Sequence, residues 1–473
     1  MKILAIDQGT TSTRALIFGA NGQGRLVHSV VHRQFYPAPG QVEHDAGELL
    51  ANLRACIAAA EPVDAIGLAN QGESCLGWDA ETGDPVSPVI VWQDDRTQAW
   101  IDGAGAEAAA LVRERAGLPL DPYFSGSKLG LILRDNSKAQ ALHAQGRLRL
   151  GTTDAYFRDR LTGRFETDPA TASRTALMNL TTCAWDADLC ALFGVPPETL
   201  PTISDNTGDL GQIDGTPLTA SIVDQQAALY GHGCRNPGDA KITFGTGAFA
   251  LSVTGALTDP GDSGPLPTVG WRKAGETATY ALDGGVYAAS SALNWARDLG
   301  LFADFRDINA FEQPPAIRRG LAFVPALAGL ACPHWDRAAR GAWMGLGLDT
   351  SGRDMVQAVL EGVAFRMAEV CAAMDALQPL GAAVSIDGGM SANPYFGRFL
   401  ADQLGRDVVV SDDAELTARG VAMLAAEGFG QPLQERSGGQ TIRPRPTDPA
   451  DKQRFAAARE AVQTYGQVNR RER

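Results

Sequence analysis

The stretch from residue 2 to residue 18 decides the fold, and it reads Lys2-Ile-Leu-Ala-Ile-Asp7-Gln8-Gly9-Thr10-Thr11-Ser12-Thr-Arg14-Ala-Leu-Ile-Phe18. The apolar runs on either side of the Gly/Thr segment predict two strands joined by a tight turn. Such a turn exposes backbone N–H groups and hydroxyls in a small concavity, which suits a phosphate chain. We therefore expect a phosphate-binding hairpin at the start of the chain.

The same layout returns halfway along the chain, as Ala240-Lys-Ile-Thr-Phe244-Gly245-Thr246-Gly247-Ala-Phe249-Ala-Leu-Ser-Val-Thr254. Two such hairpins, one in each half, predict two related lobes that hold one nucleotide between them. A chain of 473 residues is long enough for two domains. We place a substrate-binding lobe with the first phosphate loop at residues 1–233. A second lobe, with the second loop and the adenosine site, follows at residues 234–473.

The composition of the chain limits the kinds of molecule that it could bind. The net charge of −14 argues against nucleic acid or an anionic membrane as a bulk partner. It leaves a phosphate ligand open, because that binding is local. The sequence lacks a signal-peptide pattern and an apolar run of membrane-spanning length, and its seven scattered cysteines are typical of reduced thiols. We expect a cytoplasmic protein.

Strand and helix patterns alternate along the chain, which predicts an α/β protein. Buried strands are expected at residues 65–69 and 383–386, and a long helix at residues 353–377. The second of these strands leads into Asp387-Gly388-Gly389-Met-Ser-Ala-Asn393-Pro394. Asn393 is expected to cap the following helix, with Pro394 in its first turn.

The groups that could bind a nucleotide are distributed over three Gly-rich loops. Thr10, Thr11 and Ser12 supply hydroxyls near the β- and γ-phosphates, and Asp7 ends a buried strand where it could hold Mg²⁺ through water. Each loop alone could be a plain turn, but all three in this order point to a nucleotide. The second loop contributes Gly245 and Thr246. In the third, Gly388 and Gly389 form a flat shelf for adenine, with Asn393 beside it.

Asp224 is the candidate general base, in the segment Ile222-Val-Asp224-Gln225-Gln226. A strand ends and a helix begins there, so Asp224 could cap that helix. The cap position would also orient its carboxylate towards the cleft between the lobes. In phosphoryl transfer a carboxylate accepts the proton of the attacking hydroxyl.

A second set of side chains, Gln71, Glu73, Trp92, Asp94 and Tyr123, gathers at strand ends and loops. Polyols need hydrogen-bonding groups and a flat apolar face, and this set offers both. The alternative is that Trp92 belongs to the core and Glu73 to the surface.

These segments together resemble the FGGY family of carbohydrate kinases, and its glycerol kinase branch most closely. The similarity runs from residues 7–14 to the region of Glu427. It includes Val91-Trp92-Gln93-Asp94-Asp95-Arg96-Thr97, Ala172-Ser173-Arg174-Thr175 and Asp224-Gln225-Gln226-Ala227-Ala228-Leu229.

The resemblance implies two actin-like (ribonuclease H-like) ATPase lobes with a hinged cleft between them, and a homodimer by family habit. It implies that ATP and Mg²⁺ bind at the loops, through Thr10, Thr11, Arg14, Gly245, Thr246, Gly388 and Asn393. It also implies Asp224 as the base. A glycerol-type pocket would be lined by Glu73, Trp92, Tyr123, Asp224, Gln225 and Phe249.

One position departs from the family pattern. Glycerol kinases usually carry Arg before the pocket glutamate, where this chain has Gly72. Losing a charge-assisted hydrogen bond would cost roughly 1.5–3 kcal/mol, and Gly72 leaves room for extra carbons. We expect a polyol somewhat larger than glycerol, although another donor could fill the space and keep glycerol as the substrate. The alternatives are a pentulose kinase, acting on xylulose or ribulose, and a non-catalytic actin-like nucleotide or sugar binder.

Overall fold

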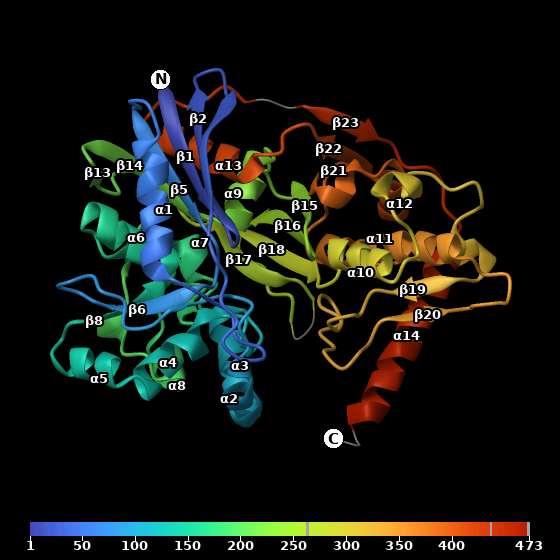
Figure 1. The fold of residues 1–473 in the computed structure, drawn as a ribbon, viewed down its shortest axis with the longest axis horizontal. Coiled ribbons are helices and arrows are strands. Elements are labelled where there is room, and N and C mark those ends of the chain that lie inside the picture. Colours follow the sequence, from blue (N-terminus) through green and yellow to red (C-terminus); the bar gives the residue numbers. More distant parts are fainter. Residues whose placement is uncertain (262–263, 436–437, 471–473) are drawn as a thin grey trace.

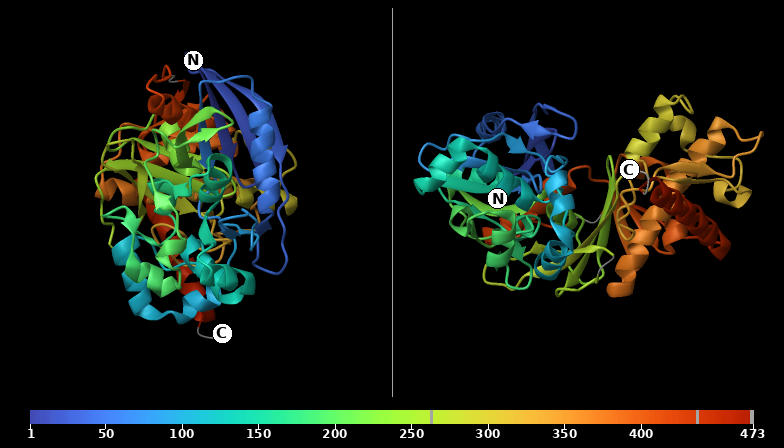
Figure 2. Two further views of the ribbon diagram at one scale, coloured as in Figure 1. Left: turned by 90° about the vertical axis from the view of Figure 1, so that its left-hand side faces the viewer. Right: turned by 90° about the horizontal axis from the view of Figure 1, so that it is seen from below.

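The computed structural model describes residues 1–261, 264–435 and 438–470. The chain forms two α/β lobes that lie side by side, as Figure 1 and the view from below in Figure 2 show. The first lobe is built on a six-stranded sheet. In spatial order its strands are β13 (Gln212–Ile213), β14 (Thr216–Val223), β5 (Ala65–Asn70), β1 (Lys2–Gln8), β2 (Ser12–Gly19) and β3 (Gly24–Val31).

The second lobe is built on a seven-stranded sheet. In spatial order its strands are β17 (Leu266–Trp271), β18 (Thr279–Val286), β16 (Ala248–Gly255), β15 (Ala240–Phe244), β21 (Ala383–Gly388), β22 (Asp407–Ser411) and β23 (Gly439–Ile442).

The two sheets share one core topology. In the first sheet β1 pairs antiparallel with β2 and parallel with β5. In the second sheet β15 pairs antiparallel with β16 and parallel with β21. One further parallel strand follows on one side (β14 or β22), and one further antiparallel strand on the other (β3 or β18). The predicted repeat of strand, Gly/Thr turn and strand is confirmed. In each sheet it forms the central hairpin, β1–β2 in the first and β15–β16 in the second.

Smaller sheets complete the strands. A four-stranded sheet holds β4 (Glu43–His44), β7 (Val89–Ile90), β6 (Cys75–Asp79) and β8 (Leu148–Thr152). Three two-stranded sheets pair β10 (Met178–Asn179) with β11 (Ala184–Trp185), β12 (Thr202–Ile203) with β9 (Glu166–Thr167), and β19 (Ala322–Val324) with β20 (Ala342–Met344).

Helices cover the sheets. In the first lobe these are α1 (Ala46–Ala58), α2 (Gln98–Gly103), α3 (Gly105–Ala116), α4 (Ser125–Asp135), α5 (Ser137–Ala144), α6 (Thr153–Thr162), α7 (Pro169–Ala172), α8 (Ala187–Phe193) and α9 (Asp224–Gly231). The second half of the chain adds α10 (Ser290–Asp298), α11 (Gly352–Leu377), α12 (Pro394–Leu404), α13 (Leu416–Gly428) and α14 (Pro449–Arg470). Short 3₁₀ turns are η1 (Pro197–Thr199), η2 (Phe305–Ile308), η3 (Ala316–Arg319) and η4 (Gly389–Ala392).

Helix α13 comes from the second half of the sequence but packs on the first sheet, beside β1 (Figure 1). Its buried face shares one apolar cluster with β1, β5, β14 and α9, and with side chains of β16 to β18. Helices α13 and α9 touch at glycines. A Cβ on Gly420 of α13 would lie 1.7 Å from the carbonyl oxygen of Ala227, and a Cβ on Gly231 of α9 would lie 1.9 Å from the carbonyl oxygen of Leu416. This close crossing ties the second half of the chain to the first lobe.

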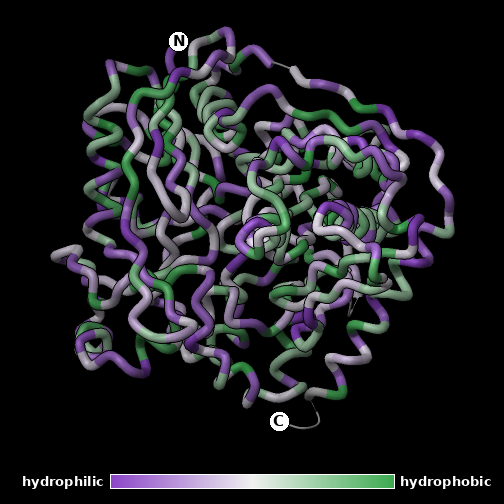
Figure 3. The backbone as a smooth tube through the Cα atoms, turned by 45° about the vertical axis from the view of Figure 1, so that its right-hand side comes forward, coloured by the Kyte–Doolittle hydropathy of each residue, from purple (hydrophilic) through white to green (hydrophobic). Residues whose placement is uncertain are grey.

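Figure 3 shows hydrophobic and hydrophilic residues mixed along the coloured parts of the tube in both lobes. Among the described residues, no helix combines the length and the apolar character that crossing a membrane requires. All seven cysteines are free and buried.

Candidate active site

A cavity of about 140 Å³ brings together Gly72 and the six residues that the family resemblance implied for the substrate. Gln71 and Asp94, which were grouped with them from the sequence, do not line it; the carboxylate of Asp94 instead accepts from the N–H of Val42 and pairs with Arg96. Its lining is Thr10, Gly72, Glu73, Trp92, Tyr123, Arg174, Val223, Asp224, Gln225, Gln226, Phe249, Leu251 and Asp283. These residues come from both lobes, because Phe249 and Leu251 lie on β16 and Asp283 lies on β18. The cavity therefore lies where the two sheets meet.

Aromatic rings form one wall of this cavity. The rings of Trp92 and Tyr123 meet edge to face, with centroids 5.6 Å apart. The buried ammonium group of Lys128 donates to the carbonyls of Trp92 and Tyr123, and so holds both loops in place. The indole N–H of Trp92 donates to the Thr10 hydroxyl over 3.0 Å. This bond connects the cavity wall to the first Gly/Thr loop.

Glu73 is held in an unusual backbone conformation, with φ of 56°. A non-glycine residue in this region carries strain that the surroundings must offset, which is common at ligand sites. Its carboxylate accepts from Nε of Arg174 over 2.7 Å. Burial raises the pKa of Glu73, and the guanidinium of Arg174 opposes that shift. Glu73 is therefore a buried wall residue rather than a surface residue.

Asp224 is the first residue of α9, and Val223 occupies the cap position without a side-chain cap bond. The expectation that Asp224 caps the helix is therefore wrong, because the helix begins one residue earlier than a cap at 224 requires. Its Oδ1 accepts instead from the backbone N–H of Gln225 over 2.6 Å. Burial, followed by the negative charges of Asp7 and Glu73, raises the pKa of Asp224 to about 7. A carboxylate with this pKa suits a general base at neutral pH.

Asp7 lies near the end of β1, and its backbone pairs with that of Arg14 on β2. Burial is the main reason that its pKa rises to about 6; Arg14 lowers it and Glu415 raises it again. Arg14 is ion-paired with Glu415, which precedes α13. Within residues 1–261, 264–435 and 438–470, no three His, Cys, Asp or Glu side chains cluster closely enough to hold a metal on their own.

The first two loops predicted for the nucleotide are tight and well anchored. The N–H of Gly9 donates to the carbonyl of Ser12, which closes the first turn, and Thr11 is exposed at its tip. In the second loop, backbone N–H groups at the start of α10 donate to the carbonyls of Gly245 and Thr246. Both loops directly follow central strands, the first β1 and the second β15.

The third loop follows β21. A Cβ on Gly388, whose φ is +87°, would lie 2.3 Å from the carbonyl oxygen of Phe244, so this position requires glycine. Gly389 has open space around it. Asn393 is the predicted cap of α12: its Oδ1 accepts from the N–H of Phe396, and its Nδ2 donates to the carbonyl of Ile308.

Three charged residues of this region were not predicted as site residues. Arg174 and Asp283 line the cavity, and Lys241 lies fully buried on β15. The ammonium group of Lys241 donates to Oε1 of Gln225 over 2.6 Å, which fixes the orientation of that amide. Arg174 could have been found from the sequence, because it lies in the segment at residues 172–175 that resembles the family. A single Asp or Lys inside an apolar strand, as at Asp283 and Lys241, has no such pattern around it.

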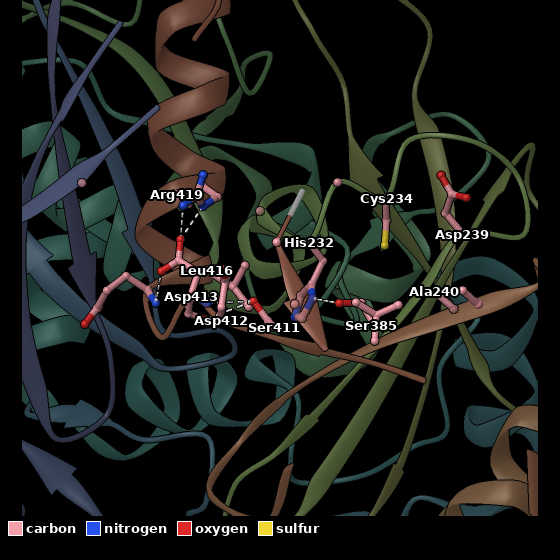
Figure 4. A pocket seen from close by; sticks show the side chains of 18 of the residues that line it. His232, Cys234, Asp239, Ala240, Ser385, Ser411, Asp412, Asp413, Leu416 and Arg419 are labelled. Carbon is pink, nitrogen blue, oxygen red and sulfur yellow. Dashed lines mark hydrogen bonds and ion pairs between the residues drawn. The ribbon is translucent and has the colours of Figure 1, made fainter. Parts of the chain in front are cut away.

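A larger hollow of about 870 Å³ lies elsewhere and contains none of the predicted site residues. It opens at the beginnings of β15 and β21, near Ala240 and Ala383, whereas the Gly-rich loops follow the ends of these strands. Figure 4 shows its wall, where His232 bonds to Ser385 over 2.7 Å and Asp413 pairs with Arg419. The predicted substrate-binding residues line the smaller cavity instead.

Comparison with known proteins agrees with this geometry. The model of the FGGY family of carbohydrate kinases, N-terminal domain, matches residues 2–231, and that of the C-terminal domain matches residues 240–428. Glycerol kinases of Alkalilimnicola ehrlichii and Ectopseudomonas mendocina are 42% and 41% identical, each over 90% of both chains. The crystal structure of Plasmodium falciparum glycerol kinase with ADP has a TM-score of 0.87 and 27% identity, and covers 98% of both chains.

The chain belongs to the FGGY family of carbohydrate kinases. The predicted two-lobed actin-like architecture is confirmed. The family also makes the chain a phosphotransferase that acts on an alcohol group, with ATP as the phosphate donor.

Proposed function

We propose that this chain transfers the γ-phosphate of ATP to a terminal hydroxyl of a polyol with three or four carbons, glycerol or a tetritol. The observation that carries the proposal is the cavity of about 140 Å³ with Asp224 in its wall. An apolar cavity of about 150 Å³ in another protein holds benzene, which has as many non-hydrogen atoms as glycerol. A pentulose is considerably larger than such a space.

The lining suits a polyol in its chemistry as well as its size. The faces of Trp92, Tyr123 and Phe249 offer apolar surface to the carbon chain. Glu73, Asp224 and Gln225 offer acceptors and donors to the hydroxyls. Relatives at about 40% identity that are named glycerol kinases support the same substrate class.

In the proposed reaction Asp224 accepts the proton of the attacking hydroxyl while the lobes hold the polyol and the phosphate chain in line. Thr10, Thr11 and Ser12 on one lobe, and Gly245 and Thr246 on the other, would contact the phosphates. Gly388, Gly389 and Asn393 would border the adenine. Closure of the lobes would exclude water and limit hydrolysis of ATP.

Mg²⁺ fits the residues present. Mg²⁺ in kinases is usually held by one or two carboxylates, water and the substrate phosphates. Asp7 and Asp224 could supply such a pair, because they are close enough for the charge of Asp7 to add to the effect of burial on the pKa of Asp224. When bound, Mg²⁺ would neutralise charge on the phosphates.

We further propose that the protein works in the cytoplasm, which its free and buried cysteines support. The homodimer that the family suggests stays a prediction.

The direct test is identification of the product. The chain is incubated with MgATP and glycerol or erythritol, and the mixture is analysed by ³¹P NMR and mass spectrometry. We expect ADP and a phosphomonoester of the polyol. Formation of ADP with inorganic phosphate alone would contradict the proposal, because it would describe an ATPase without a polyol acceptor.

A further inference from the structure

One guanidinium group joins the two lobes inside the cavity. Nε of Arg174 donates to Oε1 of Glu73 over 2.7 Å, and Nη2 lies 3.0 Å from Oδ2 of Asp283. Glu73 follows β5 in the first lobe, whereas Asp283 lies on β18 in the second. Arg174 therefore connects two carboxylates that belong to different lobes.

Each of these carboxylates keeps one oxygen for another partner. Over the ranges that the structure describes, Oε2 of Glu73 and Oδ1 of Asp283 have no hydrogen-bond or ion-pair partner. The side chains of Glu73 and Asp283 are only 7% and 16% exposed, and both line the cavity. Neither oxygen is among the fully buried atoms without a partner, so both can be reached from the cavity. The hydroxyl groups of a bound polyol could donate to them.

We propose that Asp283 is a further substrate-binding residue, contributed by the second lobe, and that Arg174 is a positioning residue that fixes Asp283 against Glu73. This inference rests on the proposed function. The planar guanidinium group is suited to hold two carboxylates in fixed directions, which a lysine cannot do. The polyol would then be bound by a carboxylate of each lobe, so that substrate binding itself favours lobe closure.

Polyols that lack one hydroxyl test this assignment. The specificity constant kcat/KM is measured for glycerol, propane-1,2-diol and propane-1,3-diol with the wild-type chain and with Asp283→Ala. A diol that is turned over too slowly is measured as a competitive inhibitor instead. We expect Asp283→Ala to lower kcat/KM for glycerol roughly ten- to a hundredfold. For the diol that lacks the hydroxyl bound by Asp283, the loss should be much smaller.

Arg174→Met separates positioning from direct contact. If Arg174 acts through Asp283 and Glu73, the variant should raise KM for glycerol and weaken the discrimination between glycerol and both diols. Adding Asp283→Ala to Arg174→Met should then change the selectivity little, because residues that act as one unit are not additive. Arg174→Lys keeps the charge but loses the planar fork, and it should restore only part of the selectivity.

A matched control is available in the ion pair of Arg272 and Asp205. It joins the residue that follows β17 in the second lobe to the first lobe, and it lies outside the cavity. Asp205→Asn should leave the selectivity unchanged. The unfolding midpoint and the affinity for ADP are measured for every variant. If Asp283→Ala does not fold, Asp283→Asn replaces it, with the same pattern expected at a smaller amplitude.

Equal losses for glycerol and both diols in the Asp283 variant would overturn the inference, because Asp283 would then serve only as a contact between the lobes. A wild-type chain that phosphorylates no polyol would overturn the proposed function itself, and this inference with it. The two failures are distinguishable, because only the second is seen without any variant.

Discussion

At the scale of single residues, the main prediction is the pH dependence that Asp224 gives to phosphoryl transfer. Its pKa is raised to about 7, first by burial and then by the charges of Asp7 and Glu73. Only the deprotonated carboxylate can accept the proton of the attacking hydroxyl. The rate of phosphoryl transfer should therefore fall as the pH drops through about 7, and level off above it.

The Asp224→Asn variant provides the control for this pH dependence. An amide keeps the size of the side chain but cannot act as a base, so kcat should fall roughly a hundredfold or more. Binding of ADP, measured by calorimetry, should be retained. An unchanged kcat, or a wild-type rate that is flat between pH 6 and 8 in a range where the protein stays folded, would remove Asp224 from this role.

At the scale of elements, the turn after β21 offers two neighbouring glycines with different surroundings. Alanine at Gly388 would combine a positive φ with a Cβ 2.3 Å from the Phe244 carbonyl oxygen, whereas Gly389 borders open space. Gly388→Ala should lower the free energy of unfolding by at least ~1–3 kcal/mol. Gly389→Ala should keep the wild-type unfolding midpoint and weaken only the nucleotide affinity. Equal midpoints for both variants would contradict this account of the loop.

The turn between β5 and β6 tests the substrate size. A Cβ on Gly72 would lie 2.9 Å from Cγ2 of Val223, so an arginine fits only if Val223 moves. We expect Gly72→Arg alone to lower stability, and Gly72→Arg with Val223→Ala to restore it. Relative to Val223→Ala alone, the double variant should favour glycerol over erythritol by roughly tenfold. An unchanged ratio of the two specificity constants would count against Gly72 as the position that sets substrate size.

The sequence predicted the hairpins, the strands at residues 65–69 and 383–386, the long helix and the cap at Asn393, because these depend on local patterns. Through the family resemblance it also predicted part of the cavity lining, namely Glu73, Trp92, Tyr123, Asp224, Gln225 and Phe249. Local patterns could not reveal the ion pairs of Arg174, because Glu73 and Asp283 reach it from distant parts of the chain. The error at Asp224 concerns the exact start of a helix. Because α9 begins at residue 224 and not at 225, Asp224 is the first helical residue and Val223 takes the cap position.

At the scale of the whole molecule, the first lobe is not complete in the first half of the chain. Side chains of α13, such as Val421 and Leu424, are fully buried in one cluster with Ile3 and Ala69. A fragment of residues 1–233 would expose that face to water. We expect it to lack a cooperative thermal unfolding transition, and coexpression with residues 234–473 to restore one. A well-folded monomeric fragment would contradict this dependence.

The central claim is that the chain phosphorylates a small polyol in a cavity shared by both lobes. The most direct measurement is the specificity constant from ADP release with MgATP and glycerol, erythritol, threitol, xylitol, ribitol, xylulose and ribulose. We predict the highest constants for glycerol or the four-carbon polyols, with activity lost in Asp224→Asn. Turnover confined to xylulose or ribulose, or no turnover of any of these compounds, would contradict the claim.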